Sequence, residues 1–304
     1  MKKDLLTLRD LSADDCEALF MRSLELKERQ LAGIVDRTFQ GKTLGLIFDK
    51  PSTRTRVSFE AAMVQLGGTP LLLNAEDTQL IRNEPIYDTA RVLSRYLDGL
   101  VVRTYSQDLL KDLAAAASIP IINGLTDLYH PCQVLSDLMT ILEKRGSLKD
   151  LRIVWVGDGN NVAHSWLNAA AILPLNLVLA CPEGYLPDES ILGAAIKDTK
   201  GRIALLSDPK EAVRDADVIY TDVWASMGHE SEHGLRKKIF KPFQVSQGLL
   251  SMAKHDVMVM HCLPAHRGEE IAADVLEGAN SVVWDQAENK LHMHKAILER
   301  FMSC

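Results

Sequence analysis

The chain has 304 residues, of which 47% are hydrophobic and 25% are charged, and its formal net charge at pH 7 is −7. This length allows two domains with separate cores, and the composition excludes a disordered or fibrous chain. The acidic balance gives no general attraction to nucleic acid or to anionic membranes, although a local basic pocket could still hold a small anion.

The amino-terminal stretch MKKDLLTLRDLSADD meets acidic and polar side chains before an apolar core can form, so it predicts no export signal. The longest apolar stretch, residues 169–181, is too short to span a bilayer and predicts a helix, a turn and a buried strand. The five cysteines have no metal-ligand spacing, and their odd number cannot pair fully within one chain. We therefore expect a cytoplasmic protein that needs no membrane partner.

From residue 43 the chain alternates short apolar runs with segments of helical periodicity. The run TLGLIFD (43–49) predicts a strand, and a helix follows it. One apolar face of that helix contains Phe59, Ala62, Met63 and Leu66. Ser52 is the predicted N-cap, and Gly67 is the predicted stop.

The same alternation continues to the carboxyl end of the chain. Further strands are predicted within TPLLLN, GLVVRT, IPIIN, LRIVWVGD, LNLVLAC, RIALLSD, DVIYTDV and DVMVMHCL, with helical segments between them. Such alternation predicts an α/β protein with doubly wound parallel sheets. The polar break KRGSLKD marks a boundary, so we expect domains over 1–145 and 146–285, and a final helix over 286–304 that packs back on the first domain.

Ligands of such sheets bind where strands end and loops lead into helices. The first of these places carries hydroxyls, a guanidinium and free helix N–H groups, which together suit a phosphate. Its candidate residues are Ser52, Thr53, Arg54 and Thr55. The alternative is an ordinary N-cap followed by exposed arginines, and Arg56 could pair instead with Glu60.

Arg103 ends another predicted strand, and His130 and Gln133 lie where the next strand turns into a helix. Arginine and histidine donors beside a phosphate would suit a carbonyl oxygen that becomes an oxyanion. Taken singly, each could be structural, since His130 precedes Pro131 and Gln133 falls in a first helical turn.

The stretch VWVGDGNNVAHSW resembles the glycine-rich turn of a dinucleotide site, which makes a nicotinamide-dependent oxidoreductase the alternative from another class. The third fingerprint position is Val162, however, and Cys181 stands where the ribose-binding acid is expected. Asn160 and Asn161 could bind a polar substrate or could be turn residues that tolerate positive φ.

Asp222 ends a predicted strand and could hold a substrate ammonium, or it could cap a helix or turn. Cys262 ends another strand and could be a reactive thiolate or a buried structural cysteine. The histidines and cysteines near it have no familiar ligand spacing, so no metal site is predicted.

Six motifs resemble, in order along nearly the whole chain, one family: the aspartate/ornithine carbamoyltransferases, and within them the ornithine-specific members. They are STRTR (52–56), DTARVLSR (88–95), HPCQ (130–133), DGNNVAHS (158–165), DVWASMG (222–228) and HCLPAHRGEE (261–270). The resemblance implies two doubly wound domains with the active site in the cleft between them. It also implies a homotrimer, because Gln79 matches a position that reaches a neighbouring subunit's site.

The resemblance also implies residue roles. Carbamoyl phosphate would contact Ser52, Thr53, Arg54, Thr55, Gln79, Arg103, His130, Gln133, Cys262, Leu263 and Lys290. Ornithine would contact Asn161, Asp222, Ser226 and Met227. The catalytic groups would be Arg54, Arg103, His130, Asp222 and Cys262. Lys290 stands where the family commonly has arginine, and lysine lacks the planar fork for a bidentate contact.

The implied reaction needs no cofactor: the carbamoyl group of carbamoyl phosphate passes to the δ-amine of L-ornithine, giving L-citrulline and phosphate in arginine biosynthesis. Putrescine or an acylated ornithine remains open as the acceptor. A catalytically silent carbamoyl-phosphate-binding subunit is a further alternative. Such a subunit, however, need not keep Asp222, Cys262 and the loop around Ser226 together.

Overall fold

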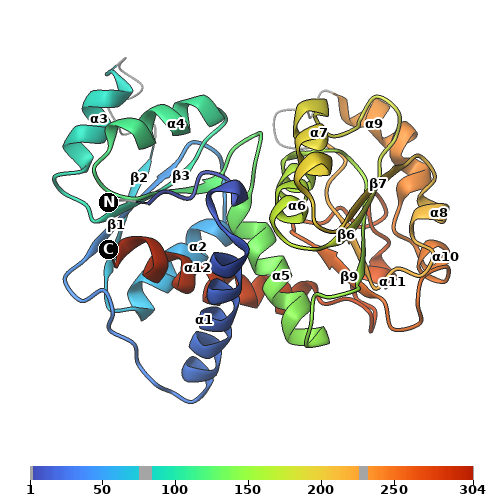
Figure 1. Ribbon diagram of the computed structural model, residues 1–304, viewed down its shortest axis with the longest axis horizontal. Helices are drawn as coiled ribbons and strands as arrows, with labels where there is room; N and C mark the ends of the chain where they lie inside the picture. Colours follow the sequence, from blue (N-terminus) through green and yellow to red (C-terminus); the bar gives the residue numbers. More distant parts are fainter. Residues whose placement is uncertain (1–2, 75–83, 226–231, 304) are drawn as a thin grey trace. The chain divides into compact units, whose positions relative to one another are not determined.

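The computed structural model describes residues 3–74, 84–225 and 232–303, and the chain forms two compact units (Figure 1). Unit 1 consists of residues 1–144 and 288–304, and unit 2 consists of residues 145–287. The divisions expected from the sequence are at 145 and 285.

Unit 1 is built on a four-stranded sheet of order β2-β1-β3-β4 in which every neighbouring pair is parallel. Its elements are η1 (Leu8–Asp10), α1 (Ala13–Leu31), β1 (Thr43–Phe48), α2 (Arg54–Gln65), β2 (Thr69–Asn74), α3 (Ile86–Leu93), β3 (Gly99–Arg103), α4 (Gln107–Ala116), β4 (Ile121–Leu125), α5 (Pro131–Arg145) and most of α12 (Val283–Met302). Helix α12 lies beside α2 (Figure 1), where the ring of His294 stacks on Phe59 with 3.6 Å between ring centroids.

Unit 2 is built on a five-stranded parallel sheet of order β7-β6-β5-β8-β9. Its elements are β5 (Arg152–Val156), α6 (Asn161–Ile172), β6 (Asn176–Ala180), α7 (Glu189–Asp198), β7 (Arg202–Leu206), α8 (Pro209–Ala212), β8 (Val218–Thr221), α9 (His233–Phe240), η5 (Lys241–Phe243), α10 (Gln247–Leu250), β9 (Met258–His261) and α11 (Ala273–Leu276). The predicted fold class, with two parallel α/β sheets, is confirmed.

Alternation along the strands of unit 2 separates two buried faces. Val154 and Val156 pack with α8, α10 and α11, whereas Trp155 between them stacks on Tyr220 with ring centroids 5.3 Å apart. Trp166 of α6 meets the same tyrosine edge-on. Successive side chains of a strand point to opposite faces, so a strand buried on both faces is apolar throughout.

Helix α1 is an addition to the elements expected from the sequence. Ser12 and Asp15 form a capping box at its start, with the side chain of Ser12 accepting from the N–H of Asp15 at 3.1 Å. Its buried residues include Cys16, Leu19 and Phe20. A capping signal followed by apolar residues at helical spacing was therefore present in the sequence.

Two predicted helix starts are wrong. Thr53, not Ser52, is the N-cap of α2, and its helical backbone (φ −83°, ψ −58°) leaves it without a side-chain cap. Helix α12 begins at Val283 rather than 286, because the chain is already helical where the N–H of Gln286 donates to the carbonyl of Val282 at 2.9 Å. Among the described helices, none is long and apolar enough to cross a membrane.

Candidate active site

Each sheet reverses its strand order once, and the predicted site residues follow the strands on either side of that reversal. In unit 1 the reversal lies between β1 and β3, which lead to Arg54 and end in Arg103. In unit 2 it lies between β5 and β8, which lead to Asn160 and Asp222. Such switch points are where open α/β sheets bind ligands.

The start of α2 has an uncapped first turn and a cation that pairs with none of the described residues. Thr53 makes no side-chain cap, so N–H groups of the first turn can bind an anion. Within the described part of the chain, the guanidinium of Arg54 makes no hydrogen bond or ion pair. Arg56 differs, since its Nε lies 3.0 Å from Oε1 of Glu60, and the predicted alternative for Arg56 is confirmed.

Lys290 of α12 joins two predicted donor residues that are distant in the sequence. Its Nζ donates to Oγ1 of Thr55 at 3.0 Å and to Oε1 of Gln133 at 2.9 Å, and only 4% of the residue is exposed. The amide of Gln133 in turn donates to Oδ1 of Asp137 at 2.8 Å. The buried ammonium therefore brings α2, α5 and α12 together at one place in unit 1.

His130 is buried beside these cations and stays neutral. Burial lowers its pKa well below the ordinary 6.5, and the charges of Lys290 and Arg103 lower that pKa further. Arg103 is itself only 6% exposed. An uncharged imidazole among cations can offer one N–H donor to a carbonyl oxygen without adding positive charge.

Lys50 is a residue that sequence reasoning missed. It is 3% exposed, forms an ion pair with Asp127, and lies over the ring of Tyr105 with 4.0 Å from Nζ to the ring centroid. These three residues stand in the loops after β1, β4 and β3. Lys50 thus ties together the loops that carry Arg54, Arg103 and His130. Only its position two residues before Ser52 could have drawn attention to it.

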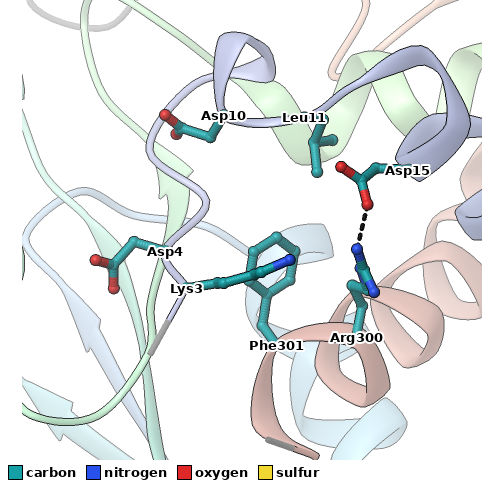
Figure 2. Close-up of a pocket in the computed structure, with 7 residues that line it drawn as sticks. All are labelled: Lys3, Asp4, Asp10, Leu11, Asp15, Arg300 and Phe301. Carbon is teal, nitrogen blue, oxygen red and sulfur yellow. Dashed lines mark hydrogen bonds and ion pairs between the residues drawn. The ribbon is translucent and has the colours of Figure 1, made fainter. Parts of the chain in front are cut away.

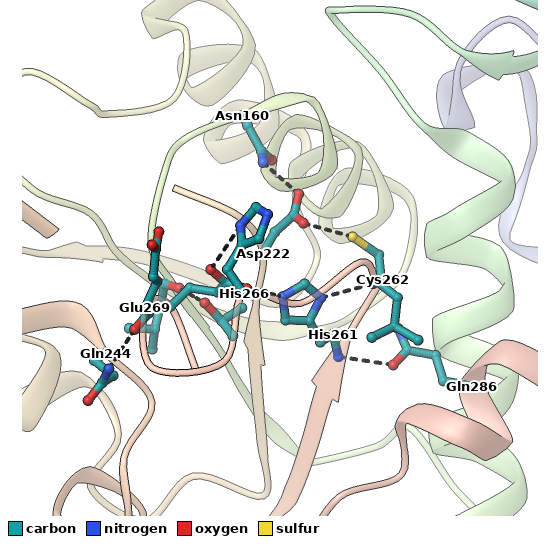
Figure 3. A network of polar contacts seen from close by, with 12 residues as sticks. Asn160, Asp222, Gln244, His261, Cys262, His266, Glu269 and Gln286 are labelled. Atoms are coloured by element: carbon teal, nitrogen blue, oxygen red, sulfur yellow. Dashed lines mark hydrogen bonds and ion pairs between the residues drawn. The ribbon is translucent and has the colours of Figure 1, made fainter. Parts of the chain in front are cut away.

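In unit 2, Asp222 is held through both carboxylate oxygens (Figure 3). The amide of Asn160 donates to Oδ2 at 2.8 Å, and the thiol of Cys262 donates to Oδ1 at 3.0 Å. Three residues that follow β5, β8 and β9 therefore meet at one carboxylate. A thiol that donates to a carboxylate keeps its proton, because a thiolate there would place two anions side by side.

The two neighbouring asparagines have different structural positions. Asn160 is the N-cap of α6, and its Oδ1 accepts from the N–H of Val162 at 2.9 Å. Asn161 is the first residue of α6, and its carbonyl accepts from the hydroxyl of Ser165. Asn160 has a φ of −80°, so the interpretation as a positive-φ turn residue is wrong for it.

Three predicted site residues, Gln79, Ser226 and Met227, lie outside the described residues. Their assignments stay predictions. Of the other predicted site residues, Leu263 has a left-handed backbone with φ of +58°. Cys132 is buried, which raises the pKa of its thiol to about 12 and leaves it protonated.

A group of Asp222, His261 and Cys262 has ligand atoms within 4.8 Å of one another, which is close enough for a metal ion. Both ring nitrogens of His261 are engaged, however. Nδ1 accepts from the N–H of Leu263 at 2.9 Å, and Nε2 lies 3.0 Å from Oε1 of Glu270 (Figure 3). The arrangement as it stands leaves this histidine no lone pair for a metal.

The glycine-rich turn after β5 serves packing within the chain. A Cβ at Gly159 would lie 2.2 Å from the nitrogen of Pro187, and the N–H of Gly159 donates to the carbonyl of Tyr185 at 2.9 Å. The chain's own segment therefore occupies the space that a pyrophosphate would need above this glycine. This packing argues against the dinucleotide alternative.

A pocket of about 250 Å³ lies at the amino-terminal segment of unit 1, away from these residues (Figure 2). Its lining is Lys3, Asp4, Asp10, Leu11, Asp15, Arg300 and Phe301. Asp10 accepts from the N–H groups of Leu6 and Thr7, and Asp15 pairs with Arg300. Asp10 thus holds the amino-terminal segment locally, the pair of Asp15 and Arg300 joins α1 to α12, and no predicted site residue lines the pocket.

Comparison with protein families decides the relationship of the chain. The carbamoyl-phosphate-binding domain of aspartate/ornithine carbamoyltransferases matches residues 3–143, and their aspartate/ornithine-binding domain matches residues 149–301. The chain belongs to the aspartate/ornithine carbamoyltransferase family. It is 58% identical to the ornithine carbamoyltransferase of Syntrophus aciditrophicus over 299 residues, which cover 98% of this chain and 99% of that protein.

Other members of the carbamoyltransferase family agree in sequence and in structure. The chain is 54% identical to the anabolic ornithine carbamoyltransferase of Pyrococcus furiosus, covering 99% of this chain and 96% of that protein. A solved structure of ornithine carbamoyltransferase from P. furiosus superposes with a TM-score of 0.96, covering 99% of this chain and 97% of that one. The second family domain extends to residue 301, so it includes the part of α12 that packs within unit 1.

Proposed function

We propose that this family member transfers the carbamoyl group of carbamoyl phosphate to the δ-amine of L-ornithine, giving L-citrulline and phosphate. The observation that carries the proposal is the pairing of charges: cations gather at the switch point of unit 1, and a held carboxylate, Asp222, stands at that of unit 2. A phosphate needs cations to bind it, and an acceptor that carries an ammonium group needs a carboxylate. Full-length likeness to ornithine carbamoyltransferases supports the choice of acceptor.

On the donor side, Arg54 and the first turn of α2 would bind the phosphate, together with Ser52, Thr53 and Thr55. Lys290 supports this contact, because it orients the hydroxyl of Thr55. Arg103 and the neutral His130 would donate to the carbamoyl oxygen as it becomes an oxyanion, while Gln133 would orient the carbamoyl group. As the tetrahedral intermediate collapses, the bond to the phosphate oxygen breaks and the phosphate leaves with its electron pair.

On the acceptor side, Asp222 would bind the α-ammonium of ornithine, with Asn161, Ser226 and Met227 as further contacts. Cys262 and Leu263 would lie next to both substrates. The uncharged δ-amine attacks the carbamoyl carbon and then loses a proton. Holding the two reactants in attack geometry supplies a large share of the rate.

We further propose a cytoplasmic homotrimer in which Gln79 reaches the site of a neighbouring subunit, and a role in arginine biosynthesis. The relative from P. furiosus that bears the word anabolic in its name is 54% identical to this chain, which supports the biosynthetic direction. Light scattering of the purified protein measures the assembly directly.

The test supplies carbamoyl phosphate with one acceptor at a time: L-ornithine, putrescine, N-acetylornithine or L-aspartate. Ornithine should give citrulline and phosphate in equal amounts and the highest kcat/KM. A higher kcat/KM with putrescine or acetylornithine would transfer the assignment to that related activity. Folded protein that binds carbamoyl phosphate but carbamoylates none of the four would be a silent binding subunit, and the proposal would then be wrong.

A further inference from the structure

The loop after β9 contains a buried carboxylate to which the mechanism above gives no role. Glu270 has a side-chain exposure of 0%, and its Oε1 lies 3.0 Å from Nε2 of His261 and 2.5 Å from the backbone nitrogen of His266. Burying a carboxylate is unfavourable unless hydrogen bonds compensate. Here the compensation at Oε1 comes from the ring of His261 and from the loop backbone, and Oε2 lies 3.7 Å from Nδ1 of His266.

The hydrogen bonds of His261 determine which of its nitrogens carries the proton. The N–H of Leu263 donates to Nδ1 at 2.9 Å, and a backbone N–H can only donate, so Nδ1 must be the unprotonated acceptor. Nε2 therefore carries the hydrogen and donates it to Glu270 (Figure 3). The backbone N–H of His261 donates to Oε1 of Gln286 at 3.0 Å, which fixes the start of the same loop.

Nδ1 of His261 accepts a hydrogen bond from a residue whose backbone conformation is unfavourable. Leu263 has φ of +58°, a left-handed conformation that is unfavourable for a residue with a Cβ. Backbone strain of this kind persists where surrounding contacts determine it, and it clusters at functional sites. Cys262, one residue earlier, is the residue whose thiol contacts Asp222 at 3.0 Å.

We propose that Glu270 and His261 are positioning residues of the acceptor site. Glu270 holds His261 as its Nε2–H tautomer, the free Nδ1 then anchors the N–H of Leu263, and this anchor fixes the Cys262–Leu263 backbone beside Asp222. The inference rests on the proposed function, because the pair positions Cys262 and Leu263, which are proposed to lie next to both substrates.

Two substitutions of His261 test the contact of Nδ1 and the contact of Nε2 separately. In His261→Asn the side-chain carbonyl can replace Nδ1 and accept from Leu263, while the contact with Glu270 is lost. In His261→Gln the longer amide can replace Nε2 and reach Glu270, while the acceptor for Leu263 is lost. We expect His261→Gln to lower kcat/KM for ornithine by about 10- to 100-fold and to raise the KM for carbamoyl phosphate by less, because the residues of unit 1 proposed to bind its phosphate are unchanged. His261→Asn should retain more of the ornithine kcat/KM.

A rescue experiment tests the strain directly. Glycine enters the left-handed region without the Cβ penalty, so Leu263→Gly should make the anchor less necessary. The loss caused by His261→Gln is therefore expected to be several-fold smaller in the Leu263→Gly background than in the wild-type background. Equal losses in the two backgrounds, or a higher activity of His261→Gln than of His261→Asn, would overturn the proposal.

A spectroscopic readout keeps the proposal testable if a variant fails to fold or if the wild type makes no citrulline. Protein with ¹⁵N-labelled histidine is expected to show His261 as the neutral Nε2–H tautomer, assigned by its absence from His261→Asn. In Glu270→Ala the Nε2–H population should fall, and in Glu270→Gln, whose carbonyl can still accept, it should be kept. An Nδ1–H tautomer in the wild type would contradict the inference, whereas a missing activity with the expected spectrum would count against the proposed function alone.

Discussion

The polar residues that follow the central strands differ in charge between the two units. Unit 1 presents Arg54, Arg103 and Lys290 with a neutral His130, and the described residues place no carboxylate in hydrogen-bond contact with the guanidinium of Arg54. Unit 2 presents the carboxylate of Asp222, held by an amide and a thiol. The same βα architecture therefore carries mainly cations at the strand ends of one unit and a carboxylate at those of the other, and this difference is what the proposed donor and acceptor sites rest on.

The two sites also differ in how they are assembled. In unit 2 the contacts come from loops after β5, β8 and β9, which are neighbours in one sheet. In unit 1, Lys290 comes from the last helix and contacts Thr55 across a sequence separation of 235 residues. The proposed donor site thus needs α12 packed against α2, whereas the proposed acceptor site needs the order of strands in its own sheet.

The largest expected effect comes from removing the guanidinium of Arg54, which makes no hydrogen bond or ion pair with a described residue. Arg54→Ala should lower kcat by about 100- to 1000-fold, because a donor to charge that develops in the transition state is lost. Its stability should hardly change, since the guanidinium makes no contact within the described residues and a cation at a helix start is unfavourable. Citrulline production and a thermal melt measure the two effects.

Arg56→Ala is the matched control for this change. It removes an arginine two positions along the same helix, but one that is paired with Glu60 and 45% exposed at its side chain. Such a pair contributes less than about 1 kcal/mol, so stability should fall slightly and turnover by less than about threefold. Similar losses of turnover in both variants would mean that general positive charge, rather than Arg54, serves the phosphate.

The second prediction concerns unit 2, where the charge of Asp222 is removed. Asp222→Asn keeps the shape and removes the charge, and it should lower kcat/KM for ornithine by about 10- to 100-fold, the value of a hydrogen bond to a charged group. The KM for carbamoyl phosphate should stay within about threefold. Cys262→Ser keeps a donor to the carboxylate and should cost less than Asp222→Asn. An equal rise in both KM values would show that the carboxylate does not belong to the acceptor alone.

Much of the site could be predicted because strand ends are visible in the sequence. Alternation of apolar runs and helical periodicity placed Arg103, Asp222 and Cys262 at the ends of strands, and the structure has them there or in the residue after. Physical reasoning needed only the rule that parallel strands bring their carboxyl ends to one edge. The ligand assigned to each residue came from the resemblance and stays a prediction.

Other features depend on geometry that residue types do not reveal. Ser52 and Thr53 are equally good caps by composition, and the helical dihedrals of Thr53 exclude side-chain capping. Asn160 and Asn161 both suit an N-cap, but only one can precede the first helical residue. Lys50 and Glu270 look like surface charges in the sequence, and only the structure places them in buried contacts.

The last comparison concerns acid, and its effect should fall on unit 1. His130, His292 and His294 all have pKa values lowered by burial, that of His292 to about 4. Below pH 6.5 the unfolded chain binds protons at these rings and the folded chain does not, so stability should fall as pH falls. Each ring contributes about 1.4 kcal/mol per pH unit until the pH reaches its folded pKa.

His294→Phe isolates one of these rings. Phenylalanine can keep the stack on Phe59 and removes the titration, but it also removes Nδ1, which lies 2.9 Å from Oγ of Ser58. The slope of unfolding free energy between pH 6.5 and 5 should therefore decrease by about 1 kcal/mol per pH unit, and the lost contact with Ser58 should lower stability by an amount that does not depend on pH. Hydrogen exchange of α2 and α12 follows unit 1, and tryptophan fluorescence follows unit 2, because all four tryptophans, Trp155, Trp166, Trp224 and Trp284, lie between residues 145 and 287. An unchanged slope in His294→Phe, or acid loosening seen first by tryptophan, would mean that the buried histidines of unit 1 do not set its acid sensitivity.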